Sequence, residues 1–153
     1  MNYEEINGEF LISTDKSKLD IDVIHNYLSK ESYWAKNVPL EIVQKEIKGS
    51  FCFGIYYQQK QIGFARVVSD AAVFAWLADV FVLQEFRGKG LSKWMMRFIL
   101  SHPELQGLRR WMLGTKDAHG LYEQFGFKEL EDPKRIMGLI LVKEYPAKTE
   151  EDK

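Results

Sequence analysis

The stretch DVFVLQEFRGKGLS, residues 79–92, decides the fold of this chain. It joins the end of a nearly continuous apolar run, 74–83, to two glycines, Gly88 and Gly90, and then to an amphipathic pattern over 91–99. The apolar run is typical of a strand buried on both faces, and the pattern after it has one apolar stripe at helical spacing. Glycines allow close backbone approach, and first-turn helix amides donate to anions. The stretch therefore predicts an anion-binding turn between a strand and a helix.

Two common phosphate-binding motifs do not fit this turn. A Walker loop needs Gly-x-x-x-x-Gly-Lys-Ser/Thr, a spacing that the chain lacks. A dinucleotide fingerprint needs a third glycine where Lys93 stands, and an acidic residue about 20 positions further on, whereas Glu104 follows Gly90 by only 14. Both of these nucleotide-binding motifs are therefore excluded for this turn.

The charge distribution also indicates a small anionic ligand. The formal net charge is −1, but residues 87–116 carry +6 and the remainder carries −7. A local positive segment in a neutral protein favours a small anion over a long polyanion, although a solvated basic helix face would give a similar count. We therefore expect no nucleic-acid partner.

Length and composition bound the class of protein. With 153 residues, 46% of them hydrophobic and 28% charged, the chain is expected to be one globular domain, 1–153, with frayed ends at 1–9 and 146–153. The single cysteine, Cys52, excludes an internal disulfide and a Cys-rich zinc site, and we expect no metal. No apolar run of about 18 residues and no signal-peptide pattern is present, so we expect a cytoplasmic protein away from membranes.

Periodicity predicts a mixed α/β fold, with antiparallel strands first and a strand–loop–helix–strand unit in the second half. The expected strands are 10–13, 51–57, 61–68, 74–83, 111–113 and 136–142. The expected helices are 19–28, a helix starting near Pro39, a helix starting at Leu91, and 118–125.

Two short motifs resemble the GNAT superfamily of N-acetyltransferases. Residues 87–92, RGKGLS, resemble its acetyl-CoA motif Arg/Gln-x-x-Gly-x-Gly/Ala, with Ser92 at the last position, and residues 121–127, LYEQFGF, resemble its Leu-Tyr-Glu-x-x-Gly-Phe signature. The resemblance covers roughly residues 51–130 and extends to small bacterial members whose acceptors are mostly undefined. It implies the GNAT fold: a twisted, mostly antiparallel central sheet flanked by helices and splayed where CoA enters.

The resemblance implies that acetyl-CoA is the co-substrate, held in a wedge between the strands at 76–83 and 111–113. The residues expected to bind it are Phe81, Val82 and Leu83 for the pantetheine, and Arg87, Gly88, Lys89, Gly90, Leu91 and Ser92 for the pyrophosphate. His119 is a further candidate for contact with CoA, and a capping or core role is its alternative.

The resemblance also implies direct transfer of acetyl to a primary amine. Tyr122 is the expected general acid for the departing thiolate, and its alternative is a packing role in the short helix. Asp79, alone among apolar neighbours, is the expected base and acceptor contact; its alternative is a buried carboxylate bonded to a backbone turn or an arginine. A base acting through water, or no protein base, also stays open. Tyr33 and Trp34 are expected to line the acceptor pocket or to be packing aromatics.

Two other functions compete with catalysis. One is a non-catalytic acyl-CoA sensor or interaction module on the same fold, and the other is a nucleic-acid-binding domain that uses the basic segment. The sequence leaves the acceptor amine open among polyamines, aminoglycosides, amino acids, small amines and protein amines. The expected strand at 136–142 is a candidate homodimer interface if its edge is exposed.

Overall fold

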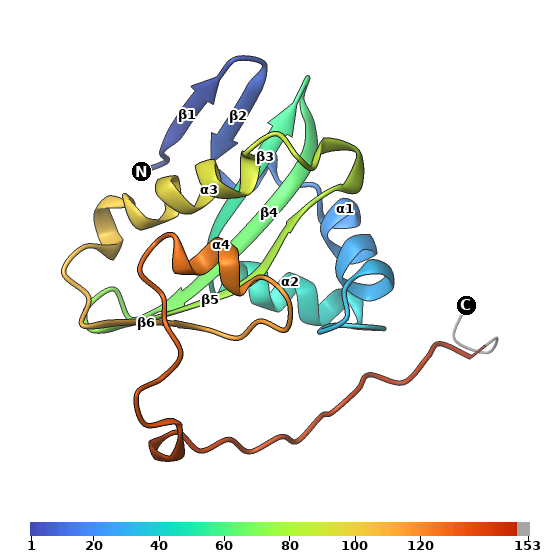
Figure 1. Ribbon diagram of the computed structural model, residues 1–153. Helices are drawn as coiled ribbons and strands as arrows, with labels where there is room; N and C mark the ends of the chain where they lie inside the picture. Colours follow the sequence, from blue (N-terminus) through green and yellow to red (C-terminus); the bar gives the residue numbers. More distant parts are fainter. Residues whose placement is uncertain (150–153) are drawn as a thin grey trace.

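The computed structural model describes residues 1–149 and confirms the mixed α/β fold. Six strands form one open sheet in the order β1-β2-β3-β4-β5-β6, antiparallel except for the last pair (Figure 1). The strands are β1 (Glu4–Asn7), β2 (Phe10–Ser13), β3 (Phe51–Tyr57), β4 (Lys60–Ser69), β5 (Phe74–Val82) and β6 (Arg110–Leu113). Because β6 runs parallel to β5, the chain must cross over between them through a helix.

The N-terminal residues, which were expected to fray, form a hairpin instead. β1 pairs antiparallel with β2 through a turn in which Gly8 has φ +61°. The Trp94 indole donates a hydrogen bond to Glu5 at 2.6 Å, and Lys18 forms an ion pair with Glu4 at 2.6 Å. Because Asn7 pairs with Phe10, the two turn residues are Gly8 and Glu9, and glycine at the first turn position is a hairpin signal that could have been recognised from the sequence.

Helices cover both faces of the sheet. They are α1 (Ile21–Asn26), α2 (Leu40–Lys48), α3 (Leu91–Leu100) and α4 (His119–Glu123), and a π-helical turn, Tyr27–Glu31, follows α1. One buried cluster joins α3 to the sheet around Phe53 and Met95, and a second joins α1 and α2 to it around Phe64 and Val43. Strand alternation explains this division, because neighbouring side chains on a strand point to opposite faces.

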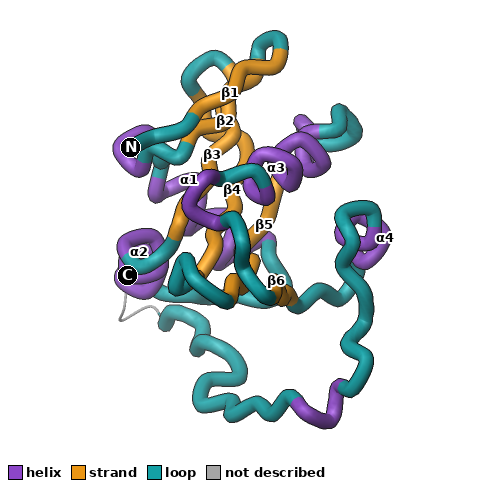
Figure 2. The backbone as a smooth tube through the Cα atoms, turned by 90° about the vertical axis from the view of Figure 1, so that its left-hand side faces the viewer, coloured by secondary structure: helices purple, strands orange, loops and turns teal. Residues whose placement is uncertain are grey.

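The strand expected at 136–142 is absent, and this prediction is wrong for the chain as described here. After α4 the chain leaves the sheet, forms a 3₁₀ turn at Pro133–Arg135, and continues as an extended tail that stands away from the body (Figures 1 and 2). Within the described chain these residues have no hydrogen-bonded strand neighbour, so their apolar, β-favouring composition alone does not make a strand. In the described part, no helix is long and apolar enough to cross a membrane.

His102 should make stability depend on pH. The ring is 4% exposed and contacts the Tyr3, Phe51 and Phe53 rings, and burial lowers its pKa although Glu104 opposes the shift. Above pH 6.5 both states hold a neutral ring. Below it the unfolded chain takes up the proton first, so the free energy of unfolding falls as pH decreases, at up to about 1.4 kcal/mol per pH unit.

Urea unfolding between pH 8 and pH 5 checks this expectation. His102→Asn keeps an acceptor for the Glu104 amide, which His102 Nδ1 now accepts at 3.1 Å, but it cannot titrate. The free energy of unfolding of the variant should be lower than that of wild type at every pH above 6.5, because packing around the ring is lost. Below pH 6.5 the variant should not show the additional decrease that His102 causes in wild type. If the free energies of unfolding of wild type and His102→Asn decreased in parallel below pH 6.5, His102 would not be the group that makes stability depend on pH.

Candidate active site

The site lies where β5 and β6 separate. Their parallel pairing begins at Phe74↔Arg110 and ends at Leu77↔Leu113, although β5 continues to Val82. The β4–β5 register also shifts between Phe64 and Arg66, which marks a bulge. The second half of β5 therefore has an open edge facing β6, and a pocket of about 600 Å³ lies beside it.

Val82 presents its backbone polar groups to this open edge. The Leu83 amide donates to Ile62 on β4 at 2.8 Å, so alternation along the strand turns the Val82 N–H and C=O the other way. Arg87 folds back over this position: its Nε donates to the Val82 carbonyl at 3.0 Å and its Nη2 donates to the Tyr27 hydroxyl at 3.0 Å. The Arg87 side chain thus fixes the turn to the end of β5.

The predicted anion turn has the expected geometry. Gly88 and Gly90 have φ +80° and +76°, in the left-handed region that favours glycine. Gly90 caps α3 without a side-chain hydrogen bond, so the first-turn amides of that helix are not used by a capping side chain. A hollow of about 270 Å³ beside the turn is lined by Val82, Phe86, Arg87, Gly88, Gly90, Leu91, Ser92, Lys93 and Leu121. Strand end, glycine turn and helix start therefore form one surface.

The residues predicted for catalysis and for the acceptor meet in the pocket. Tyr33, Trp34, Asp79 and Tyr122 all line the 600 Å³ space, although the first two come from the loop after α1 and the last from α4. His119 is the exception. It lines a neighbouring groove together with residues of β6 and with Tyr122, and its contact with CoA stays a prediction.

Asp79 is held tightly in its pocket. It is 8% exposed and has φ +54° at the β5 bulge, a conformation that Asp tolerates better than most residues. Trp34 Nε1 donates to its Oδ1 at 2.7 Å, and Arg66 Nε donates to its Oδ2. Two donors from separate elements thus compensate the buried carboxylate, which matches the arginine-bonded alternative considered for this residue.

Two residues of this network were missed at the sequence level. Arg66 Nη2 also forms an ion pair with Glu46 at 3.4 Å, and Glu46 lines the same pocket. Burial raises the pKa of Glu46, the nearby Asp79 charge adds to the increase, and Arg66 opposes it. A signal was present: Arg66 interrupts an apolar strand pattern just as Asp79 does, and two opposite charges in neighbouring buried strands suggest a pair.

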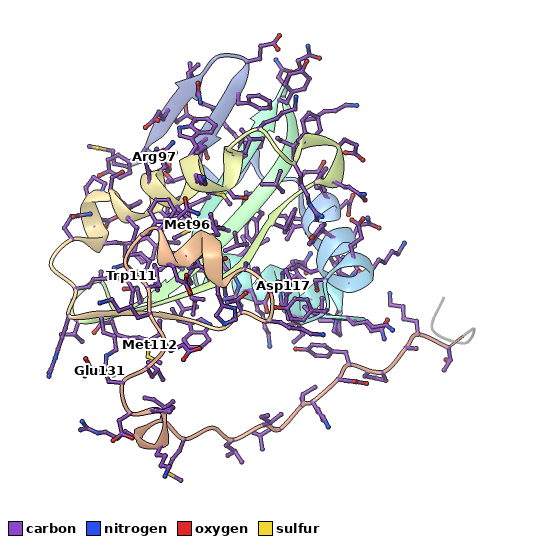
Figure 3. All side chains as sticks on the ribbon, in the orientation of Figure 1. Met96, Arg97, Trp111, Met112, Asp117 and Glu131 are labelled. Atoms are coloured by element: carbon purple, nitrogen blue, oxygen red, sulfur yellow. The ribbon has the colours of Figure 1, made fainter. Side chains whose placement is uncertain are left out.

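Tyr122 is 8% exposed, and burial raises its pKa to about 12, with further contributions from Tyr33 and Asp117. Asp117 lies on the loop before α4 (Figure 3). The phenol is therefore protonated at neutral pH and available as a proton donor. By contrast, burial raises the pKa of Cys52 to about 11, which fits a core residue. Among residues 1–149 no cluster of three His, Cys, Asp or Glu could hold a metal ion.

Comparisons with known proteins agree on one family. The Acetyltransferase (GNAT) domain family matches residues 48–129. A Xanthomonas campestris pv. campestris protein, described as a GNAT-family acetyltransferase, has a crystal structure that aligns with 50% identity and TM-score 0.84 over 86% of this chain and 93% of that one. A Gibberella zeae protein named as an acetyltransferase is 30% identical over 88% of each chain. A GNAT acetyltransferase from Elizabethkingia anophelis, with acetyl-CoA bound, shares the fold at 13% identity and TM-score 0.60, over 80% of this chain and 78% of that one.

Removing Arg66 should destabilise the protein, because it leaves two carboxylates without their cation. The Arg66 side chain is 15% exposed and that of Asp79 is 5% exposed. We expect Arg66→Met to lower the free energy of unfolding by about 3 kcal/mol at pH 7. The deficit should shrink towards pH 5, because burial already raises the pKa of Glu46 and its carboxyl, without the opposing Arg66 charge, then takes up a proton first in the folded state.

Urea unfolding of both proteins from pH 8 to pH 5 measures this effect. Arg97→Met is the matched control, since Arg97 is exposed on α3 and its loss should change stability by less than about 0.5 kcal/mol. An Arg66→Met protein as stable as the control at pH 7 would show that the network does not need its cation.

Proposed function

Since the chain belongs to the GNAT family of acetyltransferases, we propose that it transfers an acetyl group from acetyl-CoA to a primary amine by direct attack in a ternary complex. One observation carries the proposal. The open edge of β5 connects the anion turn at one end to the pocket of Asp79 and Tyr122 at the other. A ligand with a pyrophosphate, an extended arm and a reactive end group matches that sequence of surfaces.

Each part of the proposed cofactor site has a physical role. The amides of residues 88–92 donate to pyrophosphate oxygens at the start of α3, and the Lys89 and Lys93 charges add attraction. The pantetheine arm lies along the open edge of β5, as an added strand would, and reaches Val82 with its thioester end. The Val82 N–H polarises the thioester carbonyl and stabilises the oxyanion that forms on attack.

The proposed chemistry needs one base and one acid. The amine nitrogen bonds to the acetyl carbonyl carbon, and the carbon–sulfur bond breaks. Asp79 accepts the amine proton, directly or through water, while Trp34 and Arg66 keep its carboxylate in place. Tyr122 donates its phenol proton to the departing sulfur, so CoA leaves as the thiol.

The pocket favours an acceptor that carries positive charge. Its lining holds three carboxylates, those of Glu46, Asp79 and Asp117, against the two cations of Arg66 and Lys116. Aromatic side chains of Tyr33, Trp34 and Trp76 form its walls. Lys116 Nζ already lies 5.7 Å from the Tyr33 ring centroid, so this wall accepts a cation. Among the amines left open by the sequence, we therefore propose polyamine-like, aminoglycoside-like or lysine-like acceptors.

Tyr122→Phe tests the acid. Release of CoA thiol with acetyl-CoA and a panel of amines should require an added amine, and the variant should lower kcat about 100-fold with little change in the KM for acetyl-CoA. Tyr3→Phe, a matched change far from the pocket, should behave as wild type. An unchanged kcat in Tyr122→Phe would remove the acid role. Tight CoA binding without turnover on any amine would favour the sensor function.

Asp79→Asn tests the base. The amide cannot accept the amine proton, so the asparagine variant should be slower than wild type and should lack any acidic limb that the wild-type pH–rate profile shows. Glu46→Gln is the matched acid-to-amide change in the same pocket. Glu46→Gln should raise the KM for cationic amines and leave the acidic limb of the pH–rate profile unchanged. An acidic limb that persists in Asp79→Asn and disappears in Glu46→Gln would assign the base to Glu46 instead.

A further inference from the structure

One buried side chain of the first helical segment reaches the glycine turn. Tyr27 begins the π-helical turn Tyr27–Glu31 and is 8% exposed. Its ring stacks on Phe81 of β5, with ring centroids 4.0 Å apart and an angle of 12° between the planes. Because the stack fixes the direction of the ring, the hydroxyl has a set position. Single π-helical turns are frequent at functional sites, and this one brings Tyr27 to the strand that ends at the glycine turn.

The Tyr27 hydroxyl holds the side chain of Arg87. Arg87 Nη2 donates to this hydroxyl at 3.0 Å, and Arg87 Nε donates to the Val82 carbonyl at 3.0 Å. A guanidinium is planar and rigid, so two of its donors held at different points set the direction of the whole group. The Arg87 residue is otherwise exposed, so these two bonds are what keep its guanidinium against β5.

This arrangement leaves Val82 with a free donor and no free acceptor at the open edge of β5. Val82 directs both its N–H and its carbonyl to that edge, and Arg87 occupies the carbonyl. A thioester has a carbonyl oxygen that accepts hydrogen bonds, but it has no N–H to donate. A thioester beside Val82 would therefore pair with the N–H and leave the carbonyl without a partner. Arg87 supplies the donor that the thioester lacks.

We propose that Tyr27 is a positioning residue for acetyl transfer: through Arg87, it keeps the Val82 N–H directed at the thioester oxygen. The resemblance to GNAT proteins implied that Arg87 binds the pyrophosphate. In this proposal the Arg87 side chain acts within the protein, and the amides of residues 88–92 bind the pyrophosphate. The effect on catalysis rests on the proposed function, whereas the placement of Arg87 when CoA is bound does not.

Tyr27→Phe tests this role, because it removes the hydroxyl and keeps the stacked ring. We expect kcat with acetyl-CoA to fall about tenfold, since a poorly positioned donor stabilises the oxyanion less. The dissociation constant of CoA should change less than about twofold, because the turn amides are unaltered. Tyr3→Phe is the matched control and should behave as wild type. An unchanged kcat in Tyr27→Phe would overturn the proposal.

A donor without the pyrophosphate separates positioning from phosphate binding. S-Acetyl-pantetheine keeps the thioester and the arm, so Arg87→Met should lower kcat/KM by the same factor for this donor and for acetyl-CoA, at least about tenfold. Lys89→Met is the contrasting variant. It removes a charge placed near the pyrophosphate and should lower kcat/KM for acetyl-CoA more than for S-acetyl-pantetheine. A loss in Arg87→Met that is confined to acetyl-CoA would show a phosphate contact and overturn the proposal.

The double variant tests whether Tyr27 acts through Arg87. Arg87→Met/Tyr27→Phe should be no slower than Arg87→Met alone, because the hydroxyl then has no guanidinium to hold. If the losses in kcat from the two single variants multiplied in the double variant, Tyr27 would act by another route and the proposal would be wrong.

The Arg87 Nε–H signal in a ¹⁵N–¹H spectrum gives a readout that needs no turnover. Exchange of this proton with water should be several-fold slower in wild type than in Tyr27→Phe, and the protection should persist when CoA is added. Equal exchange in the two proteins, or protection lost on addition of CoA, would overturn the placement of Arg87. Protection that persists with CoA bound, in a protein that acetylates no amine, would refute the proposed function and leave the placement intact. A protein that binds no CoA would refute both.

Discussion

Strand β5 has hydrogen-bonded neighbours on both sides only as far as Leu77, and the rest of the site depends on that limit. Beyond this point β6 has ended, and β5 continues beside β4 alone. The Val82 N–H is thereby left to an open edge, while the Val82 carbonyl accepts from Arg87, in a sheet whose faces are covered by helices. The glycine turn and α3 follow at once, so a surface for an extended ligand and a surface for an anion are continuous. One interrupted pairing thus supplies both parts of the proposed cofactor site.

The same interruption places a buried charge. The bulge in the β4–β5 pairing sets Asp79 in a left-handed conformation, at a cost of about 1–3 kcal/mol that the surrounding structure must offset. Arg66 and Trp34 offset it with two donors, and Glu46 adds a second carboxylate beside them. Backbone strain and charge burial therefore converge on the pocket wall, a combination that is common at functional sites.

The sequence predicted the elements whose signals are local. The glycine turn and the amphipathic helix after it were confirmed because spacing alone specifies them, and Asp79 with Tyr122 could be named from composition and motif. Glu46 escaped prediction because its role arises only when α2 packs against the sheet beside Arg66. The composition of residues 136–142 predicted a strand. A strand also needs a hydrogen-bonded partner strand, and the local sequence pattern does not show whether such a partner is present.

The outward tail also affects how a newly synthesised chain folds. Six apolar side chains in an extended, unpaired backbone are the features that promote strand-to-strand association between any copies that meet, in register or out of it. Association of this segment with a strand edge of another chain is second order in protein concentration, whereas folding of one chain is first order. Complete refolding at low concentration and losses to association at high concentration would be the kinetic signature of this competition. The charged residues that flank the segment, Lys134, Arg135, Lys143 and Glu144, are of the type that opposes such association.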